Sequence, residues 1–228
     1  MTLYDELIAR GLIAQVTNED EIKNMINNGK ATFYIGFDCT ADSLHVGHFM
    51  ALCLMKRLQM AGNKPIALIG DGTTLIGDPS GRNATRPPLS HEQIVQNAQT
   101  YLNQAGLVLD LDRTEVRYNS EWCNKLGSVG LIQLASRYTL ARLLERDDFA
   151  KRYRENTPIA LHELLYPLMQ GYDSVALKAD VEMGGTDQTF NLLVGRTLMG
   201  QYDLEPQCIL TVPLLEGLDG VRKMSKSY

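Results

Sequence analysis

The sequence predicts an α/β fold in which a doubly wound, Rossmann-like parallel sheet carries a helical insert. Two observations support this class. Short apolar segments alternate along the chain with segments of helical periodicity, and the candidate ligand-binding motifs follow the strand segments. In doubly wound folds, ligands bind at the carboxyl ends of the strands. The chain has 228 residues, of which 44% are apolar, and this suits one globular unit with a sizeable core.

The predicted elements of the first half alternate between helix and strand. In order they are helices 2–10 and 17–27, strand 31–38, helix 49–62, strand 64–71, a glycine-rich loop 71–88, helix 90–104 and strand 114–120. Gly11 and Gly62 mark the ends of the first and third helices, and Thr17 caps the second. Ser90 and Gln93 form a capping box. The strand at 64–71 is an unbroken apolar run, which is typical of a strand buried on both faces.

The second half is dominated by helical periodicity. Residues 130–173 are almost wholly helical and contain a highly charged stretch, so we expect a mainly helical insert at about 120–160. A strand at 178–185, a helix at 187–202 and a last strand at 207–215 complete the alternation.

Charge, cysteine content and hydropathy limit the possible functions. The net charge is −5 and no run of Lys or Arg is longer than two, unlike proteins that coat nucleic acid. Four widely spaced cysteines without a C-x-x-C argue against a disulfide framework or a zinc site. No apolar run approaches the length of a signal core or a membrane span. We therefore expect a cytoplasmic protein with no bound metal, no DNA partner and no membrane contact.

His45, Gly47 and His48 stand where the helix after the strand at 31–38 begins. A helix N-terminus attracts phosphate through its unpaired N–H groups and its dipole, and two imidazoles add hydrogen-bond donors. Gly47 keeps this turn free of a side chain, which lets a nucleotide base approach the backbone. The alternative is an ordinary pair of surface histidines near a helix cap.

The segment KMSKS, residues 223–227, follows the last predicted strand. Its two lysines, Lys223 and Lys226, can clamp a leaving pyrophosphate, whereas alone the segment could equally be a solvated basic tail. Together, H-x-G-H near the first strand and K-M-S-K-S after the last are the two signatures of class I aminoacyl-tRNA synthetases. The chain resembles that class.

A polar stripe indicates which amino acid such an enzyme selects. Tyr166, Gln170 and Asp173 are spaced four and then three residues apart, so they share one face of an otherwise apolar helix. A pocket wall explains this better than a solvated face. The segments YIGFDCTADSLHVGH, IGDPSG, YPLMQGYD and GGTDQ resemble those of the bacterial tyrosyl-tRNA synthetases, from about residue 30 to the end of the chain.

This resemblance implies site residues for each substrate. For L-tyrosine it implies Tyr34 and Asp173 at the phenolic hydroxyl, Asp78, Tyr166 and Gln170 at the α-ammonium group, and Asp38 and Gln188 near the carboxylate and the ribose edge. For ATP it implies Gly36, Gly47, Gly185, Asp187, Leu215 and Lys226, with Gly185 and Asp187 at the ribose. The catalytic residues implied are Thr40, His45, His48, Arg82, Arg86, Lys223, Lys226 and Ser227. Thr40 and His45 are expected to contact the triphosphate. The two arginines, the two lysines and Ser227 are expected to act on pyrophosphate.

Three residues of this sequence have no clear counterpart among the site residues of the family. Ile35 and Ala51 stand where small thiol or hydroxyl side chains of the family can touch the ribose, and Asp71 has no assigned role.

The implied reaction is the ATP-dependent activation of tyrosine and its transfer to the 3′ end of tyrosine tRNA. Magnesium arrives with ATP rather than in a protein cage. The tyrosine carboxylate is already a nucleophile, so the protein contributes positioning and charge stabilisation. We further expect a homodimer formed through the helical insert. The anticodon-binding and small RNA-binding domains of the family are expected to be absent from this chain.

Three other interpretations stay open. A tryptophanyl-tRNA synthetase shares the expected fold, although Tyr34 with Asp173 favours tyrosine. A nucleotidyltransferase can also carry H-x-G-H, but the intact K-M-S-K-S segment argues against it. A silent synthetase paralogue with a binding role should have lost a signature residue, and none is missing.

Overall fold

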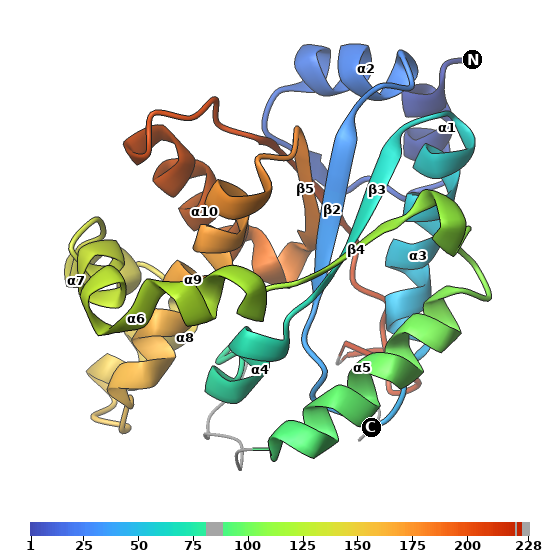
Figure 1. Ribbon diagram of the computed structural model, residues 1–228. Helices are drawn as coiled ribbons and strands as arrows, with labels where there is room; N and C mark the ends of the chain where they lie inside the picture. Colours follow the sequence, from blue (N-terminus) through green and yellow to red (C-terminus); the bar gives the residue numbers. More distant parts are fainter. Residues whose placement is uncertain (81–88, 222, 225–228) are drawn as a thin grey trace.

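A six-stranded sheet with the strand order β1-β6-β5-β2-β3-β4 forms the centre of the molecule (Figure 1). The structure is a computed structural model that describes residues 1–80, 89–221, 223 and 224. The strands are β1 Gln15–Val16, β2 Thr32–Phe37, β3 Lys64–Ile69, β4 Glu115–Tyr118, β5 Val181–Gly185 and β6 Cys208–Val212. Neighbouring strands are parallel except for β1, which pairs with β6 in the antiparallel sense. The predicted doubly wound sheet is confirmed.

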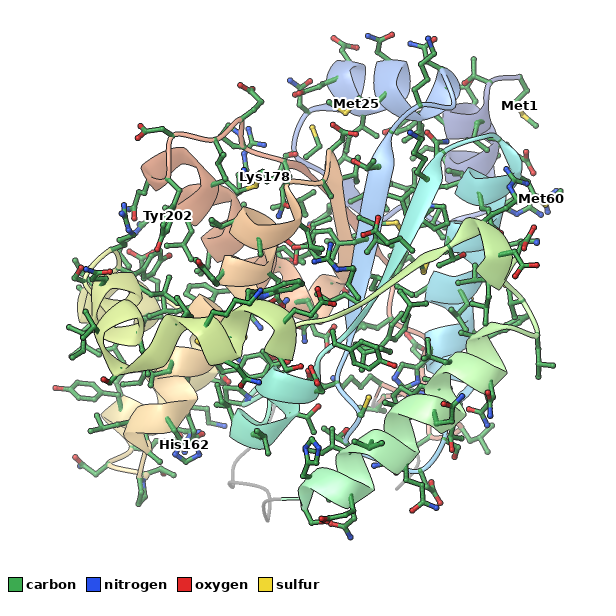
Figure 2. The ribbon with its side chains drawn as sticks, in the orientation of Figure 1. Met1, Met25, Met60, His162, Lys178 and Tyr202 are labelled. Carbon is green, nitrogen blue, oxygen red and sulfur yellow. The ribbon has the colours of Figure 1, made fainter. Side chains whose placement is uncertain are left out.

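The helices cover both faces of this sheet. They are α1 Leu3–Ala9, α2 Glu19–Asn27, α3 Val46–Met60, α4 Asp71–Ile76, α5 His91–Ala105, α6 Ser120–Ala135, α7 Leu140–Leu143, α8 Asp147–Arg154, α9 Leu161–Leu177 and α10 Thr189–Gln201. Figure 1 shows α3 and α5 on one side of the sheet and α6, α9 and α10 on the other. Side chains fill the space between the sheet and the helices on both sides (Figure 2). Among the described residues, none of the helices combines the length and the apolar character that a membrane span requires.

Alternation along β2 divides its residues between the two faces. Phe33, Ile35 and Phe37 belong to the larger apolar core, together with residues of α3 and α5. Tyr34 faces the other way and packs with Trp122 of α6. Because successive side chains of a strand point to opposite faces, Gly36 shares the face of Tyr34, where it is exposed and leaves the sheet surface open.

Three predicted details are wrong. Asn18 rather than Thr17 caps α2, because Asn18 Oδ1 accepts a hydrogen bond from Glu21 N while Thr17 Oγ1 accepts one from Ile209 N in the sheet. Residues 71–76 form the short helix α4 instead of a loop, since its glycine and threonines are held by contacts with neighbouring segments. Strand β1 is absent from the predicted elements, because two residues are too few to show periodicity. By contrast, the Ser90–Gln93 capping box is confirmed.

Residues 120–160 hold α6, α7 and α8. Helix α6 has a kink at Gly127, where φ is 58°. The interpretation of this region as an insert stays a prediction.

Candidate active site

The chain reverses its direction across the sheet between β2 and β5, which are neighbours although β3 and β4 lie between them in the sequence. In open α/β sheets, ligands bind at such a switch point, outside the carboxyl ends of the strands. Polar residues follow the ends of the parallel strands here: Asp38 after β2, Asp71 after β3, Asn119 after β4 and Asp187 after β5. The candidate site is built from this edge and from α9.

Tyr34 and Asp173 form the deep end of the site. Their exposed fractions are 1% and 3%. The Tyr34 hydroxyl lies 2.8 Å from Ser174 Oγ, and Asp173 accepts hydrogen bonds from Trp122 Nε1 at 2.7 Å and Asn119 Nδ2 at 3.3 Å. Burial raises the pKa of Tyr34, and burial also raises the pKa of Asp173 against the opposing effect of its two donors. Two hydrogen-bonding groups are thus present at the base of the site.

Glu182 of β5 lies directly behind this pair. Its carboxyl Oε2 accepts a hydrogen bond from Ser174 Oγ at 3.1 Å and another from Gln207 Nε2. Burial raises the pKa of Glu182 to about 8, although the hydrogen bonds from Tyr34, Ser174 and Gln207 act in the opposite direction. A protonated Glu182 at neutral pH fits a position where only 2% of the residue is exposed.

Asp38 occupies the middle of the site. It accepts hydrogen bonds from the Tyr166 hydroxyl at 2.8 Å and from Thr73 Oγ1 at 2.7 Å. Burial and the neighbouring carboxylates raise the pKa of Tyr166, so this phenol stays a donor at neutral pH. The structure therefore joins Asp38, predicted near the substrate carboxylate, to Tyr166, predicted at the ammonium group.

Asp78 and Gln188 meet at the outer end of the site. Gln188 Nε2 donates to Asp78 Oδ2 at 2.9 Å, and the other Asp78 oxygen accepts from Ser80 N at 2.8 Å and Ser80 Oγ at 2.6 Å. Gln170 joins them through Asn191, whose Nδ2 donates to Gln170 Oε1 and Gln188 Oε1, each at 3.0 Å. The seven predicted tyrosine-binding residues thus belong to three hydrogen-bonded groups: Tyr34 with Ser174, Tyr166 and Asp38 with Asp173 through Thr73 and Asn119, and Asp78 with Gln188 and Gln170 through Asn191.

The N-terminus of α3 folds around its two histidines. His45 is the N-cap residue: its Nδ1 accepts from Gly47 N at 3.1 Å, and His45 N donates to His48 Nδ1 at 3.2 Å. A Cβ on Gly47 would lie 2.8 Å from His45 Cε1, so glycine is needed here for the histidine ring itself. The approach of a base to this backbone stays a prediction.

The GGTDQ and KMSKS segments are in contact. Lys223 Nζ lies 2.6 Å from Asp187 Oδ2, and Met224 N donates to Leu215 O at 2.7 Å. A Cβ on Gly185 would lie 2.5 Å from Asp187 Oδ1, which accounts for glycine at that position. The remaining predicted residues of the basic loops, Arg82, Arg86, Lys226 and Ser227, lie outside the described residues.

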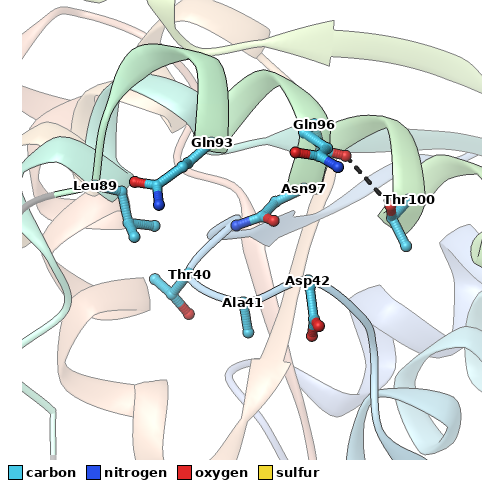
Figure 3. Close-up of a pocket in the computed structure, with 8 residues that line it drawn as sticks. All are labelled: Thr40, Ala41, Asp42, Leu89, Gln93, Gln96, Asn97 and Thr100. Atoms are coloured by element: carbon cyan, nitrogen blue, oxygen red, sulfur yellow. Dashed lines mark hydrogen bonds between the residues drawn. The ribbon is translucent and has the colours of Figure 1, made fainter.

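Thr40 lines a cavity of about 420 Å³ between the loop after β2 and helix α5 (Figure 3). The walls are Thr40, Ala41 and Asp42 on one side and Leu89, Gln93, Gln96, Asn97 and Thr100 on the other. None of the predicted tyrosine-binding residues lines it. In the part of the chain that the structure describes, no cluster of three or more His, Cys, Asp or Glu side chains could hold a metal ion.

The structure also locates the three residues without a clear counterpart. Ile35 and Ala51 are buried in the core on the face of the sheet opposite Tyr34. Asp71 joins two helices: its Oδ1 accepts from Ser120 N at 3.0 Å and its Oδ2 from Ser120 Oγ at 2.6 Å. Asp71 therefore holds the start of α6, and with it Asn119, next to α4.

Sequence reasoning misses several residues of the site. Glu182 carries a signal in the sequence, because a carboxylate inside a buried strand is rare, and Asn119 follows a strand as ligand-binding residues often do. Arg146 carries none, since it reaches Ser80 and Asn191 only through tertiary contacts. Ser80 and Asn191 are near neighbours of Asp78 and Gln188 along the chain, but no sequence pattern assigns either of them a role in the site.

Comparison with known proteins identifies the family of the chain. Residues 26–228 match the family model of the class I tRNA synthetases (W and Y), the tryptophan and tyrosine types. The chain belongs to this family.

Curated relatives within the family are similar over most of this chain. The tyrosine–tRNA ligase of Ralstonia nicotianae is 66% identical over 193 residues, which are 85% of this chain and 49% of the relative. The tyrosine–tRNA ligase of Bordetella avium is 59% identical over 228 residues, covering 98% of this chain and 56% of the relative. The chain thus spans about half the length of the curated relatives it matches.

Solved structures of class I synthetases share the fold. A C-terminally truncated mitochondrial tyrosyl-tRNA synthetase of Coccidioides posadasii superposes with a TM-score of 0.82 at 25% identity, over 99% of this chain and 70% of that one. The tyrosyl-tRNA synthetase of Archaeoglobus fulgidus, solved with L-tyrosine, gives 0.76 at 27% identity, over 99% and 68%.

Proposed function

We propose that this chain is the catalytic part of a tyrosine–tRNA ligase, which activates L-tyrosine with ATP and transfers it to the 3′ end of tyrosine tRNA. Helix α9 carries the proposal. Tyr166 and Asp173 lie seven residues apart on it, about 10 Å along the helix axis, with Gln170 between them. Polar side chains thus stand at both ends of this stretch of α9, one for the ammonium group of tyrosine and one for its hydroxyl.

The deep end selects the phenol. Tyr34 and Asp173 are buried, so a substrate ring without a hydroxyl leaves their polar atoms without that partner, which disfavours phenylalanine. Tyrosyl-tRNA synthetases are themselves the standard illustration of this rule, since they reject phenylalanine without an editing step. Tryptophan, the other substrate type of the family, has no hydroxyl to match this pair.

The outer end holds the amino-acid head. Asp78 supplies negative charge for the α-ammonium group, which Tyr166 and Gln170 also bind, while Asp38 and Gln188 lie near the substrate carboxylate and the ribose edge. The carboxylate of the substrate tyrosine attacks the α-phosphate of ATP without a general base, which breaks the α–β phosphate bond, releases pyrophosphate and forms tyrosyl-adenylate. Electrostatic stabilisation of the transferred phosphate then comes from the α3 N-terminus with His45 and His48, and from the lysines of KMSKS.

ATP binds as its magnesium complex, because Mg²⁺ prefers phosphate oxygens and water as ligands to a site made only of protein groups. Its ribose rests on Gly185 and Asp187, and its base passes Gly36, Gly47 and Leu215. Arg82, Arg86, Lys226 and Ser227 act on pyrophosphate in the same proposal.

We propose a homodimer in the cytoplasm as the working form. Val129 and Ile132 of α6 and Leu140 of α7 are apolar and have exposed fractions of 67%, 69% and 57%. Covering them with a second copy removes apolar surface from water. Light scattering tests this: Val129→Glu with Ile132→Glu should halve the mass, and an unchanged mass would contradict it.

Exchange of labelled pyrophosphate into ATP tests the catalytic proposal. The protein is assayed with L-tyrosine, L-tryptophan and L-phenylalanine in parallel. We expect exchange with tyrosine at a rate at least about 100-fold above the other two. Exchange that follows tryptophan supports the other branch of the family, and exchange with none of the three supports a silent paralogue.

A further inference from the structure

A buried arginine of the α7–α8 connection reaches the outer end of the site. Arg146 is the N-cap residue of α8, and only 7% of the residue is exposed. Its guanidinium lies 4.9 Å from the centre of the Phe149 ring, and Asp148 binds it through both oxygens, with Nε 2.8 Å from Oδ1 and Nη2 3.0 Å from Oδ2. This bidentate contact fixes the plane of the guanidinium.

The rest of that guanidinium points at groups that hold the predicted tyrosine-binding side chains. Nη2 donates to Ser80 Oγ at 2.8 Å, and Ser80 in turn donates to Asp78. Nη1 donates to Asn191 Oδ1 at 3.2 Å. Because its oxygen is occupied by Arg146, the Asn191 amide must present its nitrogen, which donates to Gln170 and Gln188.

This arrangement fixes the orientation of three side chains at once. Asn191 Nδ2 occupies one lone pair on each glutamine oxygen, which leaves the second lone pair of Gln170 Oε1 to accept from an ammonium group, while Gln188 Nε2 donates to Asp78. The Asp78 carboxylate, in turn, has one oxygen on Ser80 and the other on Gln188. Removing the guanidinium frees the Asn191 amide to rotate, and the two glutamines lose their fixed orientation.

Charge supports the same conclusion. Arg146 Nη2 lies 3.8 Å from Asp78 Oδ1, so one guanidinium stands between the carboxylates of Asp78 and Asp148. Two carboxylates and one guanidinium leave a charge of −1, which an incoming α-ammonium group neutralises. Arg146 therefore neutralises one of the two negative charges, so that Asp78 and Asp148 can lie close together while the group still attracts a cation.

We propose that Arg146 is a positioning residue for the amino-acid substrate: through Ser80 and Asn191 it orients Asp78 and Gln170 at the α-ammonium group, and Gln188 beside them. The inference rests on the proposed function, because it takes Asp78 and Gln170 as residues that bind the ammonium group. Arg146, a residue of the predicted insert, thus affects the affinity for the amino acid without contacting the amino acid.

Ligands that lack one end of tyrosine separate positioning from mere structural support. Binding is measured by calorimetry for L-tyrosine, tyramine, which lacks the carboxylate, and 3-(4-hydroxyphenyl)propionate, which lacks the ammonium group. We expect Arg146→Met to weaken L-tyrosine and tyramine by about tenfold or more and to change the affinity for the propionate by less than about twofold. In pyrophosphate exchange, KM for tyrosine rises while kcat changes less than about threefold.

Two further variants control for folding. Arg152→Met removes the other buried guanidinium of α8, which pairs with Glu163 and contacts none of the three side chains. It should lower the melting temperature and leave all three affinities unchanged. Arg146→Lys keeps the charge between the two carboxylates but cannot hold Ser80, Asn191 and Asp148 together, so we expect the same ligand pattern with a loss of about threefold or more.

Each outcome decides the proposal. Equal weakening of all three ligands by Arg146→Met, or wild-type affinity for tyrosine in both Arg146 variants, overturns it. A wild-type protein that binds none of the ligands overturns the proposed function instead, and the two failures are distinguishable because only the latter appears without any substitution.

Discussion

Lys223 Nζ lies 2.6 Å from Asp187 Oδ2, so the first lysine of KMSKS is paired with the carboxylate that we propose for the ribose of ATP. The side chains are 48% and 23% exposed, and a pair this open to solvent is worth about 0–1 kcal/mol. In the proposed site, displacing Lys223 from Asp187 costs ATP little, and the released ammonium group is then available to the phosphates.

The first prediction concerns this lysine. Lys223→Met should lower kcat for tyrosine-dependent pyrophosphate exchange by roughly 10- to 100-fold, because an ammonium group that faces the leaving pyrophosphate acts mainly in the transition state. KM for ATP should change by less than about threefold, since the lost pair with Asp187 is weak. A raised KM with an unchanged kcat would show that Lys223 only helps to bind ATP.

The second prediction concerns the phenol-binding end. Asp173→Ala should reduce the ratio of kcat/KM for tyrosine over phenylalanine by about tenfold or more, because the phenol loses its partner while phenylalanine loses little. The same change leaves Trp122 Nε1 and Asn119 Nδ2 without their acceptor, so we also expect a loss of stability of about 1–3 kcal/mol.

Asp173→Asn is the matched control for that loss. Its amide oxygen still accepts from Trp122, so it should be more stable than Asp173→Ala in urea unfolding while still losing selectivity. A selectivity ratio within about twofold of wild type in both variants would show that Asp173 does not contact the phenol.

The third prediction concerns the histidines of α3. His48→Ala and His45→Ala should each lower the rate of tyrosine activation by more than about tenfold and leave the Kd for tyrosine within about twofold, since their expected contacts are with phosphate. Stopped-flow fluorescence with saturating ATP measures both quantities.

His45 also caps the helix, and His45→Asn separates that role, because asparagine is a good N-cap residue. We expect His45→Asn to keep the thermal stability of wild type and to share the slow activation of His45→Ala. Recovery of the rate by asparagine would mean that the cap, and not the imidazole, matters for activation.

The fourth prediction concerns Glu182 and pH. Its pKa rises from 4.5 to about 8 on folding, so the folded protein binds one more proton than the unfolded chain between these values. The stability that this proton contributes is complete below pH 4.5 and is lost as the pH rises through about 8, with a slope of up to about 1.4 kcal/mol for each pH unit.

Glu182→Gln removes this titration and keeps a similar shape. The free energy of unfolding of the variant, relative to wild type, should therefore increase from pH 5 to pH 8 and level off above it. Urea unfolding at pH 5, 6, 7, 8 and 9 measures the difference. A constant difference over this range would contradict a raised pKa of Glu182.

The features that could be predicted from the sequence are those that depend on neighbours along the chain. The Ser90–Gln93 capping box involves residues three apart, and the alternation of strands and helices follows from periodicity within single segments. Spacing also placed Tyr166, Gln170 and Asp173 on one helix face, because the helical period fixes it. The family signatures H-x-G-H and K-M-S-K-S are likewise short and continuous.

The side chains that hold the site residues in place could not be predicted, because they are brought together by packing between distant segments. Tyr34 meets Ser174 across 140 residues of chain, and Arg146 meets Ser80 across 66. Such contacts depend on how the strands and helices are packed together, and no short pattern encodes that packing. The same reason explains why residues 71–76 are a helix: tertiary hydrogen bonds to Asn119 and Asp38 override a local preference for loop.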